Sequence, residues 1–155
     1  MKIVLQRVKE ASVEVEGQTI GRIGRGICLF VGVEKGDAQE DAEALAGKAT
    51  NLRIFPDKDD KMNLSLAEVG GEVLAVSQFT LAGSTKKGRR PSFDEAEEPA
   101  RAEELFRHFC ESIRKSGFRV ETGVFQAAMS VHLTNDGPVT FVLGSNKGEP
   151  GGVNR

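Results

Sequence analysis

The chain lacks tryptophan and tyrosine altogether, so its nine phenylalanines are its only aromatic residues. Stacking on a flat ligand, or on another ring, must therefore use phenylalanine. Histidine is almost as scarce, because the chain has only His108 and His132. A serine–histidine–aspartate triad would need His132, which falls within an expected strand on the same face as Ser130, and a structural or surface role fits it better. Acid-base catalysis by a side chain is therefore not expected to be the main device of this protein.

Cysteine is equally sparse, and the two cysteines, Cys28 and Cys110, show no metal-ligand spacing. Both fall in apolar runs, which is typical of buried, reduced cysteines in a cytosolic protein. The chain also lacks a nucleophile elbow, a Walker loop and a dinucleotide-binding glycine motif. The acidic segment 57–60 has neither the spacing nor the glycine of a calcium loop. We therefore expect neither a metal nor a cofactor.

Long apolar runs are missing too. No segment reaches membrane-spanning length, and residues 1–8 lack the hydrophobic region of a signal peptide. The net charge of −2 and the isoelectric point of about 5.8 argue against a broadly basic nucleic-acid coat. We expect a cytoplasmic protein without membrane contact, in which any contact with RNA is local.

The pattern of apolar residues predicts a single α+β domain with mostly antiparallel strands and two helices. Short connections join the first expected strands, which favours antiparallel pairing; these strands cover residues 2–8, 11–15, about 19–23 and 27–33. Helical spacing predicts one helix over about 38–50 and a second that ends at Gly117. We expect the domain to span residues 1–144, followed by a flexible, glycine-rich tail over residues 145–155.

The segment 74–81, with the sequence LAVSQFTL, begins as a buried strand and then becomes polar where a core strand should stay apolar. If the strand continues, alternation places Ser77 and Phe79 on one face and Gln78 and Thr80 on the other. Polar groups at the end of a buried strand must find partners or serve a ligand. A strand that simply ends in a serine/threonine turn remains an equal alternative on this stretch alone.

Two further segments are candidates for function. Asn135 to Pro138 interrupts an expected strand pair, and a plain hairpin turn explains it as well as a functional one. The irregular segment 82–98 is long for a compact domain, and such loops are usually functional or disordered. Its four cations could contact phosphate, or the segment could be only a charged, solvated loop; the cations are Lys86, Lys87, Arg89 and Arg90.

The segments 77–81 (SQFTL) and 135–140 (NDGPVT) together resemble the paired signature of the D-aminoacyl-tRNA deacylases. The resemblance covers nearly the whole chain. Further matches follow in the same order at residues 6–8, 32–34, 61–63, 90–93 and 125–129. Two separated motifs in register with so many flanking matches favour a functional interpretation of both segments.

This resemblance implies a fold and an activity. Members of the family are homodimers with a curled, barrel-like β-sheet backed by helices, and they hydrolyse the ester that joins a D-amino acid or glycine to the terminal ribose of tRNA. Gly137-Pro138 would form a cis bond and reach into the partner's pocket, where backbone carbonyls leave no room for an L side chain. By the same resemblance, Arg7 would support that turn.

The resemblance also implies the content of the pocket. Ser77, Gln78, Phe79 and Thr80 would line it, and backbone N–H groups near Phe79 and Thr80 could form an oxyanion site. Thr80 is the family's candidate nucleophile, and the competing account uses the 2′-hydroxyl of the RNA. We favour the hydroxyl, because no base is visible beside Thr80.

The terminal adenosine would pack near Phe125 and Met129, and the four loop cations would meet phosphates of the tRNA acceptor end. Gln126 and Ala128 depart from the family, which often has a small residue and an acidic residue there, so substrate preference is less certain than activity. Two other functions stay open. One is a non-catalytic module that binds tRNA acceptor ends; the other is an esterase for small esters that uses Thr80 or Ser77 as its nucleophile.

Overall fold

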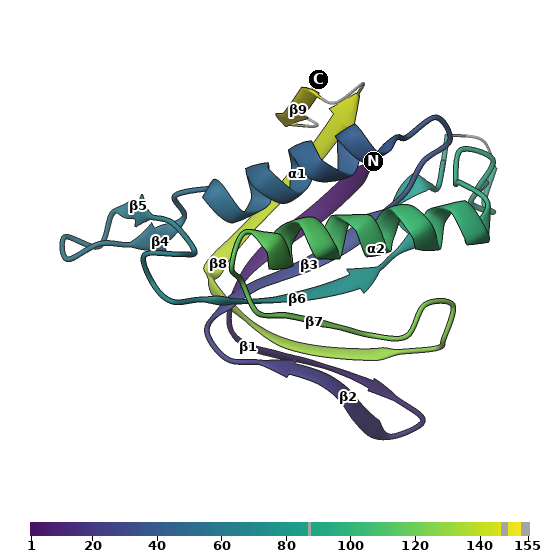
Figure 1. Ribbon diagram of the computed structural model, residues 1–155. Coiled ribbons are helices and arrows are strands. Elements are labelled where there is room, and N and C mark those ends of the chain that lie inside the picture. The colour runs from purple at the N-terminus through teal and green to yellow at the C-terminus, as the bar shows by residue number, and fades with distance from the viewer. Residues whose placement is uncertain (87, 147–148, 153–155) are drawn as a thin grey trace.

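The computed structural model describes residues 1–86, 88–146 and 149–152, and its main feature is a seven-stranded sheet with two helices on one face (Figure 1). The strands follow the order β7-β6-β3-β1-β8-β9, and β2 pairs with the free part of β1. The bounds of these strands are β1 Lys2–Val15, β2 Gln18–Ile23, β3 Gly26–Gly32, β6 Glu72–Ser77, β7 Val120–Thr122, β8 Ser130–Asn146 and β9 Glu149–Gly152. The remaining elements are a small sheet of β4 Phe55–Pro56 and β5 Met62–Leu64, the helices α1 Gln39–Asn51 and α2 Pro99–Lys115, and the 3-10 turn η1 Phe79–Ala82.

The sheet curls because β1 has different neighbours along its length. Its first half pairs with β3 and its second half with β2, while β8 follows it on the other edge. These pairs are antiparallel, as the sequence predicted, and the α+β, barrel-like architecture is confirmed. The pairs β3–β6 and β6–β7 are parallel. Parallel neighbours need long crossovers, which α1 and α2 provide.

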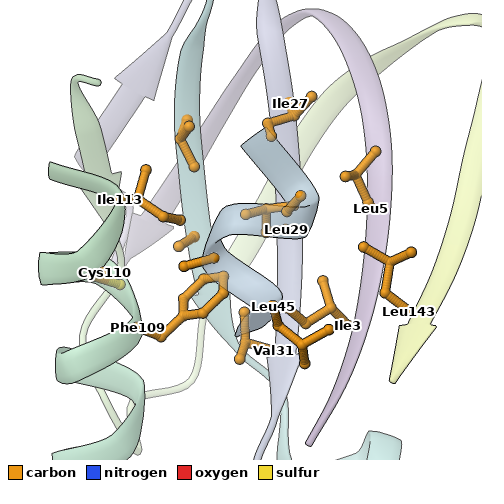
Figure 2. Packing of buried hydrophobic residues seen from close by; sticks show 14 of the residues in the cluster. Ile3, Leu5, Ile27, Leu29, Val31, Leu45, Phe109, Cys110, Ile113 and Leu143 are labelled. Carbon is orange, nitrogen blue, oxygen red and sulfur yellow. The ribbon is translucent and has the colours of Figure 1, made fainter. Parts of the chain in front are cut away.

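The apolar core forms on both faces of the curled sheet. Alternation along β1 points Ile3 and Leu5 toward the helices, where they meet Leu45 of α1 and Phe109 of α2 (Figure 2). A second cluster lies on the concave face; it contains Val8, Ala11, Val13, Ile23, Cys28, Leu74 and Val76. The helices therefore cover one side of the sheet and leave the curl to enclose the other.

Two expectations about strand boundaries were wrong. Strands 2–8 and 11–15 form one strand, β1, because both parts have partners along β8. The break expected at residues 135–138 is an irregularity within β8. In the expected tail, the described residues form the end of β8 and the strand β9, which pairs with it. Main-chain hydrogen bonds at a sheet edge need no particular side chains, so a glycine-rich sequence can supply them.

In the described part of the chain, neither helix has the length and apolar character that a membrane crossing requires.

Candidate functional site

A cavity of about 530 Å³ opens where β6 ends. Its walls come from β3, β6, the first turns of α2, the segment after β7 and the start of β8. Five residues that the sequence singled out line it together: Ser77, Gln78, Phe79, Phe125 and Met129. Most of the other walls are apolar, including Val31, Ala102 and Phe106. A mostly apolar cavity with a few convergent polar groups is typical of a ligand site.

The strand β6 stops at Ser77 and a turn follows, so of the two alternatives for this segment the strand that ends in a turn is the one that forms, and the alternation does not extend to residue 81. The N–H of Gln78 still donates to the carbonyl of Val31 at 2.8 Å, but the chain then turns into η1, and the N–H of Leu81 donates to the carbonyl of Gln78 at 3.2 Å. Alternation holds only for extended backbone, and a 3-10 turn replaces it. The polar residues therefore sit on a strand end and a tight turn.

Thr80 is adjacent to the cavity but is not among the residues that line it. Its hydroxyl accepts a hydrogen bond from the side-chain amide of Gln78, at 2.5 Å. No carboxylate or histidine among the described residues hydrogen-bonds this hydroxyl. A threonine nucleophile needs a base to take its proton, and Gln78 cannot act as one.

Phe79 lies at the rim of the cavity and is 59% exposed. Its ring meets Phe93 edge-on, with 5.0 Å between the ring centroids. Phe93 follows the basic loop, whose two ends are joined by reciprocal hydrogen bonds between the backbones of Ser84 and Ser92. The loop is therefore fastened at its base, next to η1.

The cations of this loop point to solvent where the structure describes them. Lys86, Arg89 and Arg90 are exposed, and none forms an ion pair with a described residue. Lys87 lies outside the described residues. These three exposed cations can approach an anion without first giving up a partner.

The segment between β7 and β8 supplies Phe125 and Met129 to the opposite wall. The Phe125 ring packs on Phe106 of α2, with 6.3 Å between the centroids. Gln126 also lines the cavity, whereas Ala128 is exposed and does not. Ala102 and Phe106 of α2 were not predicted as cavity residues, because their helical spacing indicates only a core position.

The Gly137-Pro138 segment is a braced bulge. Residues 136–139 of β8 lie opposite Arg7 alone, because Gln6 pairs with Thr140 and Val8 with Asn135. The Gly137-Pro138 bond is cis, and Gly137 has a φ of 126°, where any Cβ would lie 2.9 Å from the Arg7 guanidinium. Only glycine fits this position without strain.

Arg7 joins this bulge to the segment before β4. The side chain is 7% exposed, and it donates to the carbonyl of Asp136 at 3.1 Å and to the carbonyl of Ile54 at 2.5 Å. It also pairs with the carboxylate of Asp136 at 3.3 Å. The side chain of Asn135 completes the bracing, since its oxygen accepts from the N–H of Val139 at 2.9 Å. Arg7 thus contacts the residue that precedes Gly137-Pro138.

Within one chain, the bulge and the cavity are far apart. Ser77 pairs with Val31, whereas Arg7, beside the bulge, pairs with Ile27, four positions earlier on β3. Four strand residues span roughly 13 Å. In Figure 1, β6 ends on the right of the view and the bend of β8 lies on the left. The structure of one chain therefore does not bring Gly137-Pro138 to the pocket.

The remaining titratable candidates are inert in this fold. Burial raises the pKa of the Cys28 thiol to about 12, and burial likewise raises the pKa of the Cys110 thiol to about 12. His132 lies 3.6 Å from the carboxylate of Glu14 on the exposed side of β8, away from the cavity. Among the described residues, no group of three or more histidine, cysteine, aspartate or glutamate side chains is placed to hold a metal ion.

Comparison with known proteins gives concordant matches. The family model described as D-Tyr-tRNA(Tyr) deacylase matches residues 4–144. The chain is 59% identical to a D-aminoacyl-tRNA deacylase of Geobacter sulfurreducens, over 92% of this chain and 94% of that protein. It is 56% identical to the protein of the same name from Thermodesulfovibrio yellowstonii, over 92% and 98% of the two chains. The solved structure of a c-Myc DNA unwinding element binding protein superimposes with a TM-score of 0.89 at 43% identity, over 94% of this chain and 99% of that one.

Proposed function

This chain belongs to the D-Tyr-tRNA(Tyr) deacylase family, and from that premise we propose that it hydrolyses the ester bond of D-aminoacyl-tRNA and of glycine mischarged on alanine tRNA. The products are free tRNA and the D-amino acid or glycine. The observation that carries the proposal is the cavity at the end of β6, where Ser77, Gln78 and Phe79 face Phe125 and Met129. These residues belong to the segments that resemble the family, and they are brought together from two separate parts of the chain.

The 3-10 turn supplies the means to stabilise a transition state. In η1, the N–H groups of Leu81 and Gly83 donate to carbonyls of the same turn. The N–H groups of Phe79 and Thr80 come earlier in the chain and have no acceptor within the turn. Such donors stabilise the oxyanion that forms when an ester carbonyl is attacked. Aminoacyl esters are already activated, so positioning contributes much of the rate enhancement. We assign proton transfer to the 2′-hydroxyl of the terminal ribose, because Thr80 has no base beside it.

Selection against L-amino acids is proposed to occur between two subunits. The Gly137-Pro138 bulge is rigidly braced yet remote from the cavity of its own chain, so it can serve only the pocket of a partner. A row of apolar side chains that could pack against that partner crosses the sheet face opposite the helices. The row consists of Val4, Phe30 and Val142. Val4 of β1 pairs with Phe30 of β3 on one side and with Val142 of β8 on the other, and Val142 is 47% exposed. The proposed assembly is a homodimer, which light scattering would measure as twice the mass of the chain.

The basic loop is proposed to bind phosphates of the acceptor end. Its described cations, Lys86, Arg89 and Arg90, are exposed, and the loop ends at Phe93, whose ring contacts Phe79 in the cavity lining. Binding through a few phosphates depends on salt. Raising the salt concentration should therefore raise KM for aminoacyl-tRNA but not for an aminoacyl ester of adenosine alone.

The decisive experiment is to incubate the purified protein with D-tyrosyl-tRNA and L-tyrosyl-tRNA, with and without a chelator, and to follow release of the amino acid. Rapid release of the D form alone, unaffected by the chelator, is the expected result. A parallel reaction with glycyl-tRNA(Ala) tests the second substrate.

Other outcomes would separate the alternatives. Binding of tRNA without release of either amino acid would favour a non-catalytic acceptor-end module. Release of both forms would show that the Gly137-Pro138 bulge does not select chirality. Equal activity on small esters, with no effect of salt on tRNA substrates, would favour a simple esterase.

A further inference from the structure

Gln126 has a backbone conformation that its residue type disfavours. Its φ is 62°, and the N–H of Ala127 donates to the carbonyl of Val124 at 3.2 Å, so Gln126 is the third residue of a turn with the type II pattern. That position favours glycine, because a Cβ crowds the backbone at positive φ. Glutamine here therefore lowers the stability of the folded chain, and residues kept at such a cost cluster at ligand sites.

The position of Gln126 distinguishes it from the other residues with positive φ. Glu16 and Asp60 also have φ values above 50°, but both lie in exposed turns that do not line the cavity. Gln126 lines the cavity between Phe125 and Ala127. Its side chain is thus the only one of the three that can contact a ligand held there.

The amide of Gln126 is also free to bind. Of the other lining side chains that carry an amide or a carboxylate, Gln78 donates to Thr80, and the carboxylate of Glu97 accepts from the N–H of Glu98 at 2.8 Å. The Gln126 amide makes no hydrogen bond to any residue in the described part of the chain. It therefore presents both a donor and an acceptor beside the aromatic wall formed by Phe125.

We propose that Gln126 determines specificity for the terminal base of the substrate, by pairing its amide with the N6 and N7 edge of adenine. This inference rests on the proposed function, in which the terminal adenosine packs near Phe125 and Met129. A glutamine amide matches adenine in two hydrogen bonds, because its oxygen accepts from the N6 amino group and its nitrogen donates to N7. With glycine at this position, the same apolar wall would have no side-chain group that could hydrogen-bond to the base.

The test compares three D-tyrosyl esters: of adenosine, of 7-deazaadenosine, which lacks N7, and of purine riboside, which lacks the N6 amino group. For the unmodified protein, KM should rise about tenfold with either analogue, as expected for loss of a bidentate contact at a partly exposed site. For Gln126→Gly, KM for the adenosine ester should rise to the analogues' level, all three KM values should converge, and kcat should stay the same. The variant should also unfold at a higher denaturant concentration, because glycine relieves the positive φ.

Glu16→Gly is the matched control. It relieves a positive φ in the turn between β1 and β2, so it should raise the unfolding midpoint without changing any KM. If the unmodified protein treats the three esters alike, or if Gln126→Gly still distinguishes them, the assignment of Gln126 is wrong. If the unmodified protein hydrolyses none of the esters and no D-aminoacyl-tRNA, the proposed function itself fails.

Discussion

At the scale of single residues, the polar side chains at the cavity have different roles. The side-chain amide of Gln78 donates to the Thr80 hydroxyl at 2.5 Å, which fixes the start of η1 and gives that hydroxyl a partner within the turn. Ser77 closes the strand, and Gln126 faces the cavity unpaired. The resemblance implied Thr80 as a candidate nucleophile, with the 2′-hydroxyl of the RNA favoured over it; the hydrogen bond from Gln78 places the Thr80 side chain within the turn.

Thr80→Ala therefore should reduce kcat/KM on D-tyrosyl-tRNA only about fivefold, because one hydrogen bond of the turn is lost while its backbone N–H groups remain. A substrate whose terminal ribose lacks the 2′-hydroxyl should react at least about a hundredfold more slowly, as expected when the proton-transfer group is removed. Single-turnover release of the amino acid measures both effects.

Thr80→Ser controls for the hydroxyl itself. A threonine nucleophile would give the opposite pattern: the alanine variant would be inactive, the serine variant active, and the 2′-deoxy substrate nearly normal. That result would identify the Thr80 side chain as the nucleophile.

At the scale of elements, the bulge in β8 depends on a single buried side chain from β1. Arg7 satisfies the carbonyls of Asp136 and Ile54, which belong to β8 and to the segment before β4. A guanidinium can direct several donors at fixed angles, and an ammonium group cannot reproduce that fork. The shape of the bulge is therefore a property of three elements together.

Arg7→Lys should lower the free energy of unfolding by about 2 kcal/mol, because a buried carbonyl loses its charged donor. Chemical denaturation measures this change. The same variant should hydrolyse L-tyrosyl-tRNA faster than the unmodified protein does, since a less rigid bulge excludes an L side chain less completely.

Arg107→Lys, on the exposed side of α2, is the control and should change stability by less than about 0.5 kcal/mol. Equal stability of the Arg7 and Arg107 variants would show that the buried hydrogen bonds of Arg7 are not what holds the bulge.

At the scale of the whole molecule, closure of the curled sheet relies on contacts between strands that are distant in sequence. A Cβ on Gly21 of β2 would lie 2.9 Å from the carbonyl oxygen of Thr122 in β7, so glycine permits the close approach of these strands. Arg119 pairs with Glu72 at 2.6 Å and with Glu121 at 2.8 Å. The N–H of Gly24 donates to the Glu72 carboxylate at 2.8 Å.

These contacts predict a pH dependence of stability. The hydrogen bond from the N–H of Gly24, followed by that from Arg119, lowers the pKa of Glu72. A carboxyl group whose pKa is lower in the folded state stabilises the fold above its unfolded pKa, and that stabilisation is lost as the pH falls through the folded pKa. Glu72→Gln should therefore be less stable than the unmodified protein at pH 7, and the difference should shrink below about pH 4.

Denaturation midpoints measured from pH 7 down to pH 3 test this linkage. Glu103→Gln, on the exposed side of α2, is the control and should show a small difference from the unmodified protein at every pH. A Glu72→Gln difference that stays constant across the range would mean that ionisation of Glu72 does not contribute to closure.

The sequence by itself determined most of the local elements and marked the candidate site residues. The spacing of apolar residues that indicates a strand or a helix is a local property of the sequence, so β3, α1 and α2 could be predicted within a few positions. The motif segments marked Ser77 to Phe79 and Phe125 to Met129 before any contact between them was known. Local patterns could not predict the end of β6 at Ser77, since a hydroxyl, an amide and a ring are compatible with either strand or turn.

Only the tertiary structure decided how these parts meet. The cavity forms because α2 brings Ala102 and Phe106 beside the end of β6, and long-range packing of this kind leaves no local signal. The bulge around Gly137 forms because β8 must stay paired with β1 on both sides of three extra residues. The separation of that bulge from the cavity follows from the register of β1 with β3 and of β3 with β6. Register is set by the burial of whole strand faces, and hence by the complete fold.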